Sequence, residues 1–261
     1  MCYNTRITRK AEEIEAHYGV SRTEKGLAIG ELTYNHANGY NHPNFWVIPQ
    51  EGPKLITPMK WGMLRPDINA DDSNYISLVR KITGQGLNAQ SEKLFDPKSY
   101  YPKSSLVRRC VVPLDGFYEP HTCSKPKDYK VPFYFSPRDG ELLSLAGIYT
   151  ISKQKLVTFS LLTREAEPGS MYANIHNKKN WQGQNRQVVT LARNQVEQWL
   201  SNDLVQADVE RLVLNGLEEQ ALTAQPISKD LFSRNANSDR PDIVDVVHDE
   251  RITLDYSEYT R

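Results

Sequence analysis

The second residue of the chain is a cysteine, and this position allows an unusual reactive group. Because methionine aminopeptidases accept the small side chain of cysteine, removal of Met1 would make Cys2 the first residue. It would then carry a thiol and a free α-amine two carbons apart, with ordinary pKa values of about 8.5 and about 7.7–8.0. No other residue of the chain could offer this 1,2-aminothiol. The ordinary alternative is that Met1 is retained and Cys2 is a cysteine like any other.

Three other residues are of types that could assist such chemistry, and each also has a purely structural reading. Glu119 follows an apolar Gly-Phe-Tyr run and could be a solvent-facing strand end. His176, between Ile and Asn-Lys-Lys, could be a surface histidine, and Asn88 could cap a turn. Of the remaining thiols, Cys110 is predicted to be a buried structural residue and Cys123 an exposed one.

Composition excludes several functional classes. The 261 residues include 32 basic and 32 acidic ones, so any contact with nucleic acid must come from a local patch. No motif of metal, dinucleotide or nucleotide spacing is present, which predicts neither a metal nor a cofactor. Three cysteines without disulfide spacing and the lack of a long apolar run predict a cytoplasmic, membrane-free protein, expected to be a monomer.

The elements that must position these residues are mostly short strands. A helix is predicted within residues 8–19, with Thr8 as N-cap and Gly19 as its stop. An Asp115-Gly116 turn should lead into a strand ending at Glu119. The other strand signals lie at residues 45–49, 108–113, 132–135, 142–149, 156–162 and 187–191. Their close spacing predicts an α+β fold with a curled, mostly antiparallel, barrel-like sheet and peripheral short helices.

The C-terminal third adds few elements to this plan. Short helices are predicted at 193–200 and 207–214, followed by a loop at 228–242. Residues 243–247 should pair as an edge strand or fray, and the tail from about residue 248 should fray. No repeat or linker interrupts the chain, so a single domain over residues 1–261 is expected.

The order of several motifs resembles that of the SOS response-associated peptidase (SRAP) family. The resemblance spans nearly the whole chain and rests first on Cys2 and on the run from Arg109-Cys110-Val-Val-Pro113 to Asp115-Gly-Phe-Tyr-Glu119. Shorter matches support it: Leu87-Asn88-Ala89, Ile175-His176, Tyr40-Asn41-x-Pro43, Trp61-Gly62, Leu145-Ala-Gly-Ile-Tyr149 and Pro226-Ile-Ser228. The run that ends at Glu119 is the most specific of these pieces.

The resemblance implies a function in the response to DNA damage. Family members shield abasic sites in single-stranded DNA by forming a DNA-protein crosslink, a thiazolidine, through the mature N-terminal cysteine. By position, Cys2 would react, Glu119 would shuttle protons during imine formation and self-reversal, and His176 would act on the sugar ring oxygen. Asn88 would position the sugar or the cysteine. Autocatalytic-type removal of Met1 accounts for the peptidase in the family's name, and the crosslinking activity is lyase-like.

The chain departs from the family where arginines usually meet DNA phosphates. The resemblance places Asn4, Asn41, Pro43, Gln90 and Lys178 at the DNA. The family's arginines at three of these positions are replaced by Asn4, Gln90 and Lys178, and neither Asn nor Gln reproduces the guanidinium fork. No aromatic pair follows Trp61-Gly62 to stack on a base. The sequence therefore predicts a retained reactive centre with weaker contacts to DNA.

Two other functions remain open on the sequence. Cys2 could be the acyl nucleophile of a cysteine hydrolase or protease, with His176 as its base and no need of DNA. Alternatively, the chain could be a binding module without catalysis, which the neutral charge and missing arginines allow.

Overall fold

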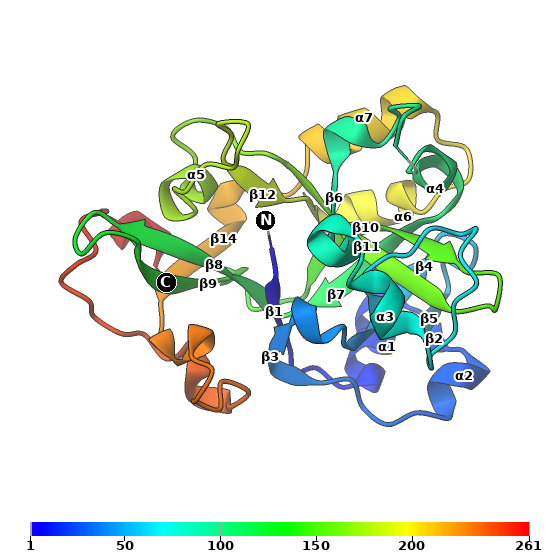
Figure 1. The fold of residues 1–261 in the computed structure, drawn as a ribbon, viewed down its shortest axis with the longest axis horizontal. Helices are drawn as coiled ribbons and strands as arrows, with labels where there is room; N and C mark the ends of the chain where they lie inside the picture. The colour runs from blue at the N-terminus through cyan, green and yellow to red at the C-terminus, as the bar shows by residue number, and fades with distance from the viewer. Residues whose placement is uncertain (1, 100, 261) are drawn as a thin grey trace.

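The centre of the protein is a closed ring of five strands. The computed structural model describes residues 2–99 and 101–260. Its ring consists of β4 (Asn44–Pro49), β5 (Leu55–Trp61), β7 (Arg109–Leu114), β10 (Leu143–Ile151) and β11 (Val157–Glu165). Neighbours pair antiparallel in the order β11-β10-β7-β4-β5, and β5 then pairs with β11 in parallel, which closes the barrel. The barrel lies on the right of Figure 1.

A second, antiparallel sheet extends from the barrel, on the left of Figure 1. Its strands are β1 (Asn4–Ile7), β3 (Tyr34–Asn38), β8 (Gly116–Cys123), β9 (Tyr129–Pro137) and β14 (Leu222–Pro226). They pair in the order β14-β9-β8-β1-β3, so β1 is an inner strand between β3 and β8. Only Asp115 separates β7 of the barrel from β8 of this sheet, which makes the two sheets one continuous scaffold.

The remaining elements are short and peripheral. Further strands are β2 (Ser21–Arg22), β6 (Asn88–Gln90), β12 (Arg186–Val188) and β13 (Thr190–Leu191). The α-helices are α1 (Ala11–Tyr18), α2 (Glu24–Leu27), α3 (Tyr75–Val79), α4 (Pro102–Val107), α5 (Met171–Ile175), α6 (Val196–Trp199) and α7 (Gln206–Leu214). This arrangement confirms the predicted α+β fold with a barrel-like, mostly antiparallel core.

One hydrophobic core spans both sheets, and a smaller one lies on the outer face of the second sheet. Tyr118 and Tyr134 in the smaller core pack against Ile227, Leu231 and Ile243. These last three belong to residues 227–247, here called the C-terminal segment, which is orange in Figure 1. The segment therefore covers part of a sheet face that would otherwise expose aromatic rings.

The structure differs from several local predictions. The helix at the start of the chain begins at Ala11, because Thr8 bonds to Asp115 and Glu13 caps the amide of Lys10 at 2.9 Å. Gly19 does end it, with a left-handed φ of 64°. Strand β8 continues to Cys123 instead of ending at Glu119. This places the Cys123 side chain in the interior, 3% exposed, against the expectation of an exposed thiol.

The C-terminal third also departs from prediction. Residues 243–247 were expected to pair as an edge strand or to fray. Instead Pro241–Val244 forms a 3-10 helix, and the segment pairs through a single isolated bridge between Ile227 and Val246. Residues 249–260, expected to fray, are tied down because Ile252, Leu254 and Tyr256 pack against the main core. The Tyr256 ring meets that of Phe133 edge to face at 5.5 Å.

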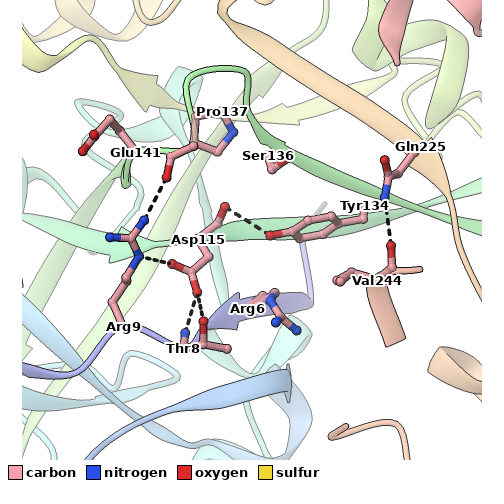
Figure 2. Close-up of a pocket in the computed structure, with 11 residues that line it drawn as sticks. Arg6, Thr8, Arg9, Asp115, Tyr134, Ser136, Pro137, Glu141, Gln225 and Val244 are labelled. Carbon is pink, nitrogen blue, oxygen red and sulfur yellow. Dashed lines mark hydrogen bonds and ion pairs between the residues drawn. The ribbon is translucent and has the colours of Figure 1, made fainter. Parts of the chain in front are cut away.

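Figure 2 shows how the start of the chain is anchored at the bend between β7 and β8. The Asp115 carboxylate accepts hydrogen bonds from the backbone N and the hydroxyl of Thr8, at 2.5 and 2.6 Å. Arg9 forms an ion pair with it at 3.7 Å, and the Tyr134 hydroxyl donates to the Asp115 carbonyl at 3.2 Å. These groups line a pocket of about 320 Å³. The contacts hold the far end of β1, and thus the strand that follows Cys2.

Candidate active site

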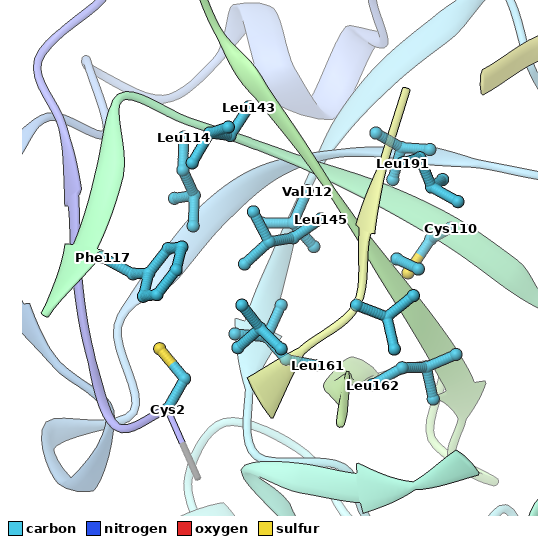
Figure 3. Packing of buried hydrophobic residues seen from close by; sticks show 14 of the residues in the cluster. Cys2, Cys110, Val112, Leu114, Phe117, Leu143, Leu145, Leu161, Leu162 and Leu191 are labelled. Carbon is cyan, nitrogen blue, oxygen red and sulfur yellow. The ribbon is translucent and has the colours of Figure 1, made fainter. Parts of the chain in front are cut away.

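Cys2 lies directly before β1 and is completely buried. Figure 3 shows its sulfur pointing toward the ring of Phe117 on β8. The Cys2 thiol lies 3.5 Å from the carbonyl oxygen of Asn4. Because β1 runs antiparallel to β8 with Asn4 opposite Tyr118, Cys2 lies alongside the stretch of β8 that carries Glu119. Met1, whose removal the family resemblance implies, lies outside the described residues.

Glu119 and His176 form a buried pair beside this cysteine. Glu119 is only 2% exposed, and its Oε2 lies 3.1 Å from Nδ1 of His176. Its Oε1 is buried and has no hydrogen-bond partner among residues 2–99 and 101–260. A buried carboxylate oxygen without a partner is costly, and such atoms occur where a ligand or a reacting group completes the site.

Asn88 completes the group by binding the backbone of Cys2. It opens β6, which pairs in parallel with β11, and its Nδ2 donates to the Cys2 carbonyl at 2.8 Å. The Asn88 Oδ1 is also buried without a hydrogen-bond partner in the described chain. Asn88, Glu119 and His176 lie 86, 117 and 174 positions after Cys2 in the chain, and all four candidate residues meet at one place.

Burial and charge set the protonation of this group. Burial raises the pKa of the Cys2 thiol well above its ordinary value, and the Glu119 carboxylate raises it further. Burial lowers the pKa of His176, and the attraction of Glu119 opposes this only in part. Both shifts favour a neutral thiol and a neutral imidazole at neutral pH.

The segment around His176 is fixed on both sides. Nδ1 of His121, on β8, bonds to the carbonyl of Ile175 at 3.1 Å. The Asn177 side chain bonds to both backbone groups of Thr122, accepting from its N and donating to its O at 2.9 Å each. Asn185 donates to the carbonyl of His176 at 2.8 Å. The imidazole is thereby held over β8 without belonging to a regular element.

The Glu119–His176 pair opens into a groove of about 1500 Å³. The groove runs over β1, β3 and β8, and the C-terminal segment forms one of its walls. Six basic and three acidic residues line it, so the groove is locally basic although the chain has no net charge. The basic residues are Lys130, Lys178, Lys179, Arg186, Lys229 and Arg234.

Four of the five residues predicted at the DNA line this groove: Asn4, Asn41, Pro43 and Lys178. Lys178 is engaged by Asp128 at 3.2 Å, and Asn4 bonds through Oδ1 to His36 at 2.9 Å. Gln90, at the end of β6, is not among the described residues that line the groove. It pairs with Thr163 on β11, so its place is on the barrel side.

Sequence reasoning missed much of the groove wall. Lys130 lies just before the strand predicted at 132–135, and Lys229 and Arg234 lie in the loop predicted at 228–242. Only the Lys178-Lys179 doublet signalled local charge. It also missed a stacked aromatic pair, Tyr3 and Tyr40, at the groove. Tyr3 directly follows Cys2 in the sequence, and this adjacency could have indicated an aromatic ring at the site.

Neither a metal-binding cluster nor a membrane-spanning helix is found in the described part of the chain. Within residues 2–99 and 101–260, no cluster of three or more His, Cys, Asp or Glu side chains could hold a metal ion. Over the same ranges, no helix combines the length and apolar character needed to cross a bilayer.

Known structures share this architecture. A protein from Bacteroides thetaiotaomicron superposes with a TM-score of 0.75 at 22% identity, covering 95% of this chain and 100% of that one. A protein from Bordetella bronchiseptica gives a TM-score of 0.67 at 18% identity, covering 87% and 100%. At these identities the comparison establishes the fold alone.

Sequence relatives carry names that refer to abasic sites. The abasic site processing protein YoqW of Bacillus subtilis is 23% identical over 79% of this chain and 88% of its own length. The abasic site processing protein YMR114C of Saccharomyces cerevisiae is 30% identical over 47% of this chain, a match that spans only 30% of the yeast protein. The model of the SOS response associated peptidase (SRAP) family matches residues 1–234. The chain therefore belongs to the SRAP family.

Proposed function

We propose that this protein attaches covalently to abasic sites in single-stranded DNA through Cys2 after Met1 has been removed. The freed α-amine attacks the C1′ aldehyde of the ring-opened deoxyribose, and loss of one water gives an imine. The thiol then adds across the C=N bond, its sulfur bonding to C1′ and its proton going to nitrogen. The product is a five-membered thiazolidine, and hydrolysis in the reverse direction releases the DNA.

The observation that carries this proposal is the meeting of Cys2, Glu119, His176 and Asn88 in one buried site. Imine formation needs a group that takes a proton from the amine and returns one to the departing hydroxyl, and Glu119 is the carboxylate beside Cys2. His176 can act as acid/base on the sugar ring oxygen: its neutral imidazole first takes up a proton and then gives it to that oxygen as the ring opens. Asn88 holds the Cys2 carbonyl and thus fixes the amine end of the residue.

The groove is suited to a nucleic acid strand. Its excess of basic side chains offers counter-charges to phosphates, and aromatic rings on its walls offer faces to unpaired bases. The names of the relatives point to the same substrate. Removal of Met1, which exposes the amine, is the proposed peptidase step.

The test is the intact mass of the protein before and after incubation with an abasic oligonucleotide. Processed protein is expected to lack the mass of Met1 and to gain the mass of the oligonucleotide less one water. Cys2→Ser should give no heat-stable adduct, whereas Cys123→Ser, which removes another buried thiol, should give the full amount. An equal adduct with Cys2→Ser would refute the chemistry.

The same experiment separates the two other functions. A cysteine hydrolase would instead show an acyl adduct with peptide esters and none with DNA. A binding module would retain Met1 and form no adduct with either.

A further inference from the structure

Two tyrosine rings stack on each other at the edge of the reactive site. The ring centroids of Tyr3 and Tyr40 are 5.1 Å apart, with 28° between the ring planes. Both residues line the groove, and Tyr40 is 44% exposed, which is high for a ring that has a stacking partner. Large exposed aromatic side chains at a groove are typical of contact sites.

The pair is held at a fixed distance from Cys2. Tyr3 follows Cys2 in the chain, and its carbonyl accepts from the backbone N of Gly39 at 2.8 Å. Gly39–Asn41 is a single 3-10 turn that carries Tyr40, and the Asn38 side chain caps it by accepting from the Tyr40 N at 3.0 Å. The turn rests on Trp61, since a Cβ on Gly39 would come within 3.1 Å of that ring. These contacts fix the positions of both tyrosine rings relative to Cys2.

We propose that Tyr3 and Tyr40 form a stacking platform for the nucleobase next to the abasic site. This inference rests on the proposed function and adds the neighbouring base to what the site recognises. An abasic site leaves its neighbouring base without a stacking partner on one side. An aromatic face can take that place for any base, because every base presents a π-face.

Asn4, which lines the groove next to Tyr3, cannot make the bidentate phosphate contact of an arginine, so phosphate binding is weaker at this position. Stacking supplies affinity that does not depend on phosphate contacts, so it offsets part of that loss.

The test uses 2-aminopurine, a fluorescent adenine analogue, placed directly beside the abasic site in a single-stranded oligonucleotide. The Cys2→Ser protein binds this probe without crosslinking, so stacking is measured apart from the covalent step. Binding should quench the fluorescence and should be lost with the added Tyr40→Ala change, together with about tenfold of affinity. Tyr40→Phe keeps the aromatic ring and should therefore keep both the fluorescence quenching and the affinity.

Trp181→Ala serves as the matched control, because it removes a ring that is 87% exposed and is not one of the groove residues. Quenching that survives Tyr40→Ala, or that disappears with Trp181→Ala, would overturn the platform. Crosslinking by the protein that retains Cys2 is measured separately, from its intact mass after incubation with the oligonucleotide. Crosslinking without Tyr40-dependent quenching refutes the platform alone, and quenching without crosslinking refutes the proposed chemistry alone.

Discussion

At the scale of single residues, the thiol of Cys2 lies buried beside the side chain of Glu119. Burial and the Glu119 charge both raise the pKa of the Cys2 thiol, so the resting sulfur is protonated. A liberated α-ammonium group two carbons away would favour the thiolate by its charge. The site would thus become reactive only when the amine is free, which couples processing to chemistry.

Replacement of Glu119 by Gln should separate two effects of this carboxylate. The thiol pKa of Cys2 should fall toward its ordinary value but stay above it, because burial is the larger cause. Crosslinking should nevertheless slow by about a hundredfold or more, since the proton carrier is gone. The pKa is measured from the ultraviolet absorbance of the thiolate as a function of pH, and the rate from the adduct mass over time.

The control for this change is Glu197→Gln, an exposed glutamate on α6. It should alter neither the thiol titration nor the rate. A Glu119→Gln protein that reacts at the normal rate would remove Glu119 from the mechanism, even if the thiol pKa shifts as expected.

At the scale of elements, β1 decides where Cys2 lies. The strand is paired on both edges, and Asp115 clamps its far end through Thr8 and Arg9. The two hydrogen bonds from Thr8 are made to an ionised acceptor that is largely shielded from water, at 14% exposure. Hydrogen bonds of this kind are stronger than those between neutral groups.

Removal of the clamp by Asp115→Ala should lower the free energy of unfolding by about 2 to 3 kcal/mol. Crosslinking should slow in the same protein, because β1 loses its anchor and Cys2 its fixed position. Urea denaturation and adduct mass measure the two effects. Asp203→Ala, in an exposed turn, should cost no more than about 0.5 kcal/mol. A clamp variant as stable as the wild type would show that pairing with β3 and β8 suffices.

At the scale of the whole molecule, buried neutral histidines link stability to pH. His36 bridges Ser238 of the C-terminal segment at 2.7 Å and Asn4 of β1 at 2.9 Å. Burial lowers the pKa of His36 to about 4, although Asp239 opposes the shift. The ordinary value in the unfolded chain is about 6.5. Between these two values the unfolded chain binds more protons than the folded one.

It follows that the contribution of His36 is fully present above about pH 6.5 and is lost as the pH falls toward 4. The loss amounts to about 3.5 kcal/mol at most, at about 1.4 kcal/mol per pKa unit. His36→Asn should therefore lose less stability between pH 7 and 4 than the wild type, as measured by urea denaturation at each pH. The exposed His248→Asn should behave as the wild type. Equal losses in the His36 variant and the wild type would place the pH dependence elsewhere.

The sequence by itself determined the elements and the order of the reactive residues. Strand spacing sufficed for an α+β, barrel-like fold, because alternating apolar residues and turns are local signals. The cysteine at position 2 was enough to suggest the aminothiol hypothesis. The motif that ends at Glu119 was the most specific sign of the resemblance to the family.

Tertiary structure alone decided which residues share the site. Glu119 proved to lie in the middle of β8, and Gln90 lies on the barrel side instead of at the groove. The basic wall and the Tyr3–Tyr40 pair come from segments that are distant in sequence and show no common pattern. Periodicity records which side of an element is buried. Which residues the buried side contacts depends on strand pairing across the whole chain. In the same way, a net charge of zero does not show how the charged side chains are distributed over the surface.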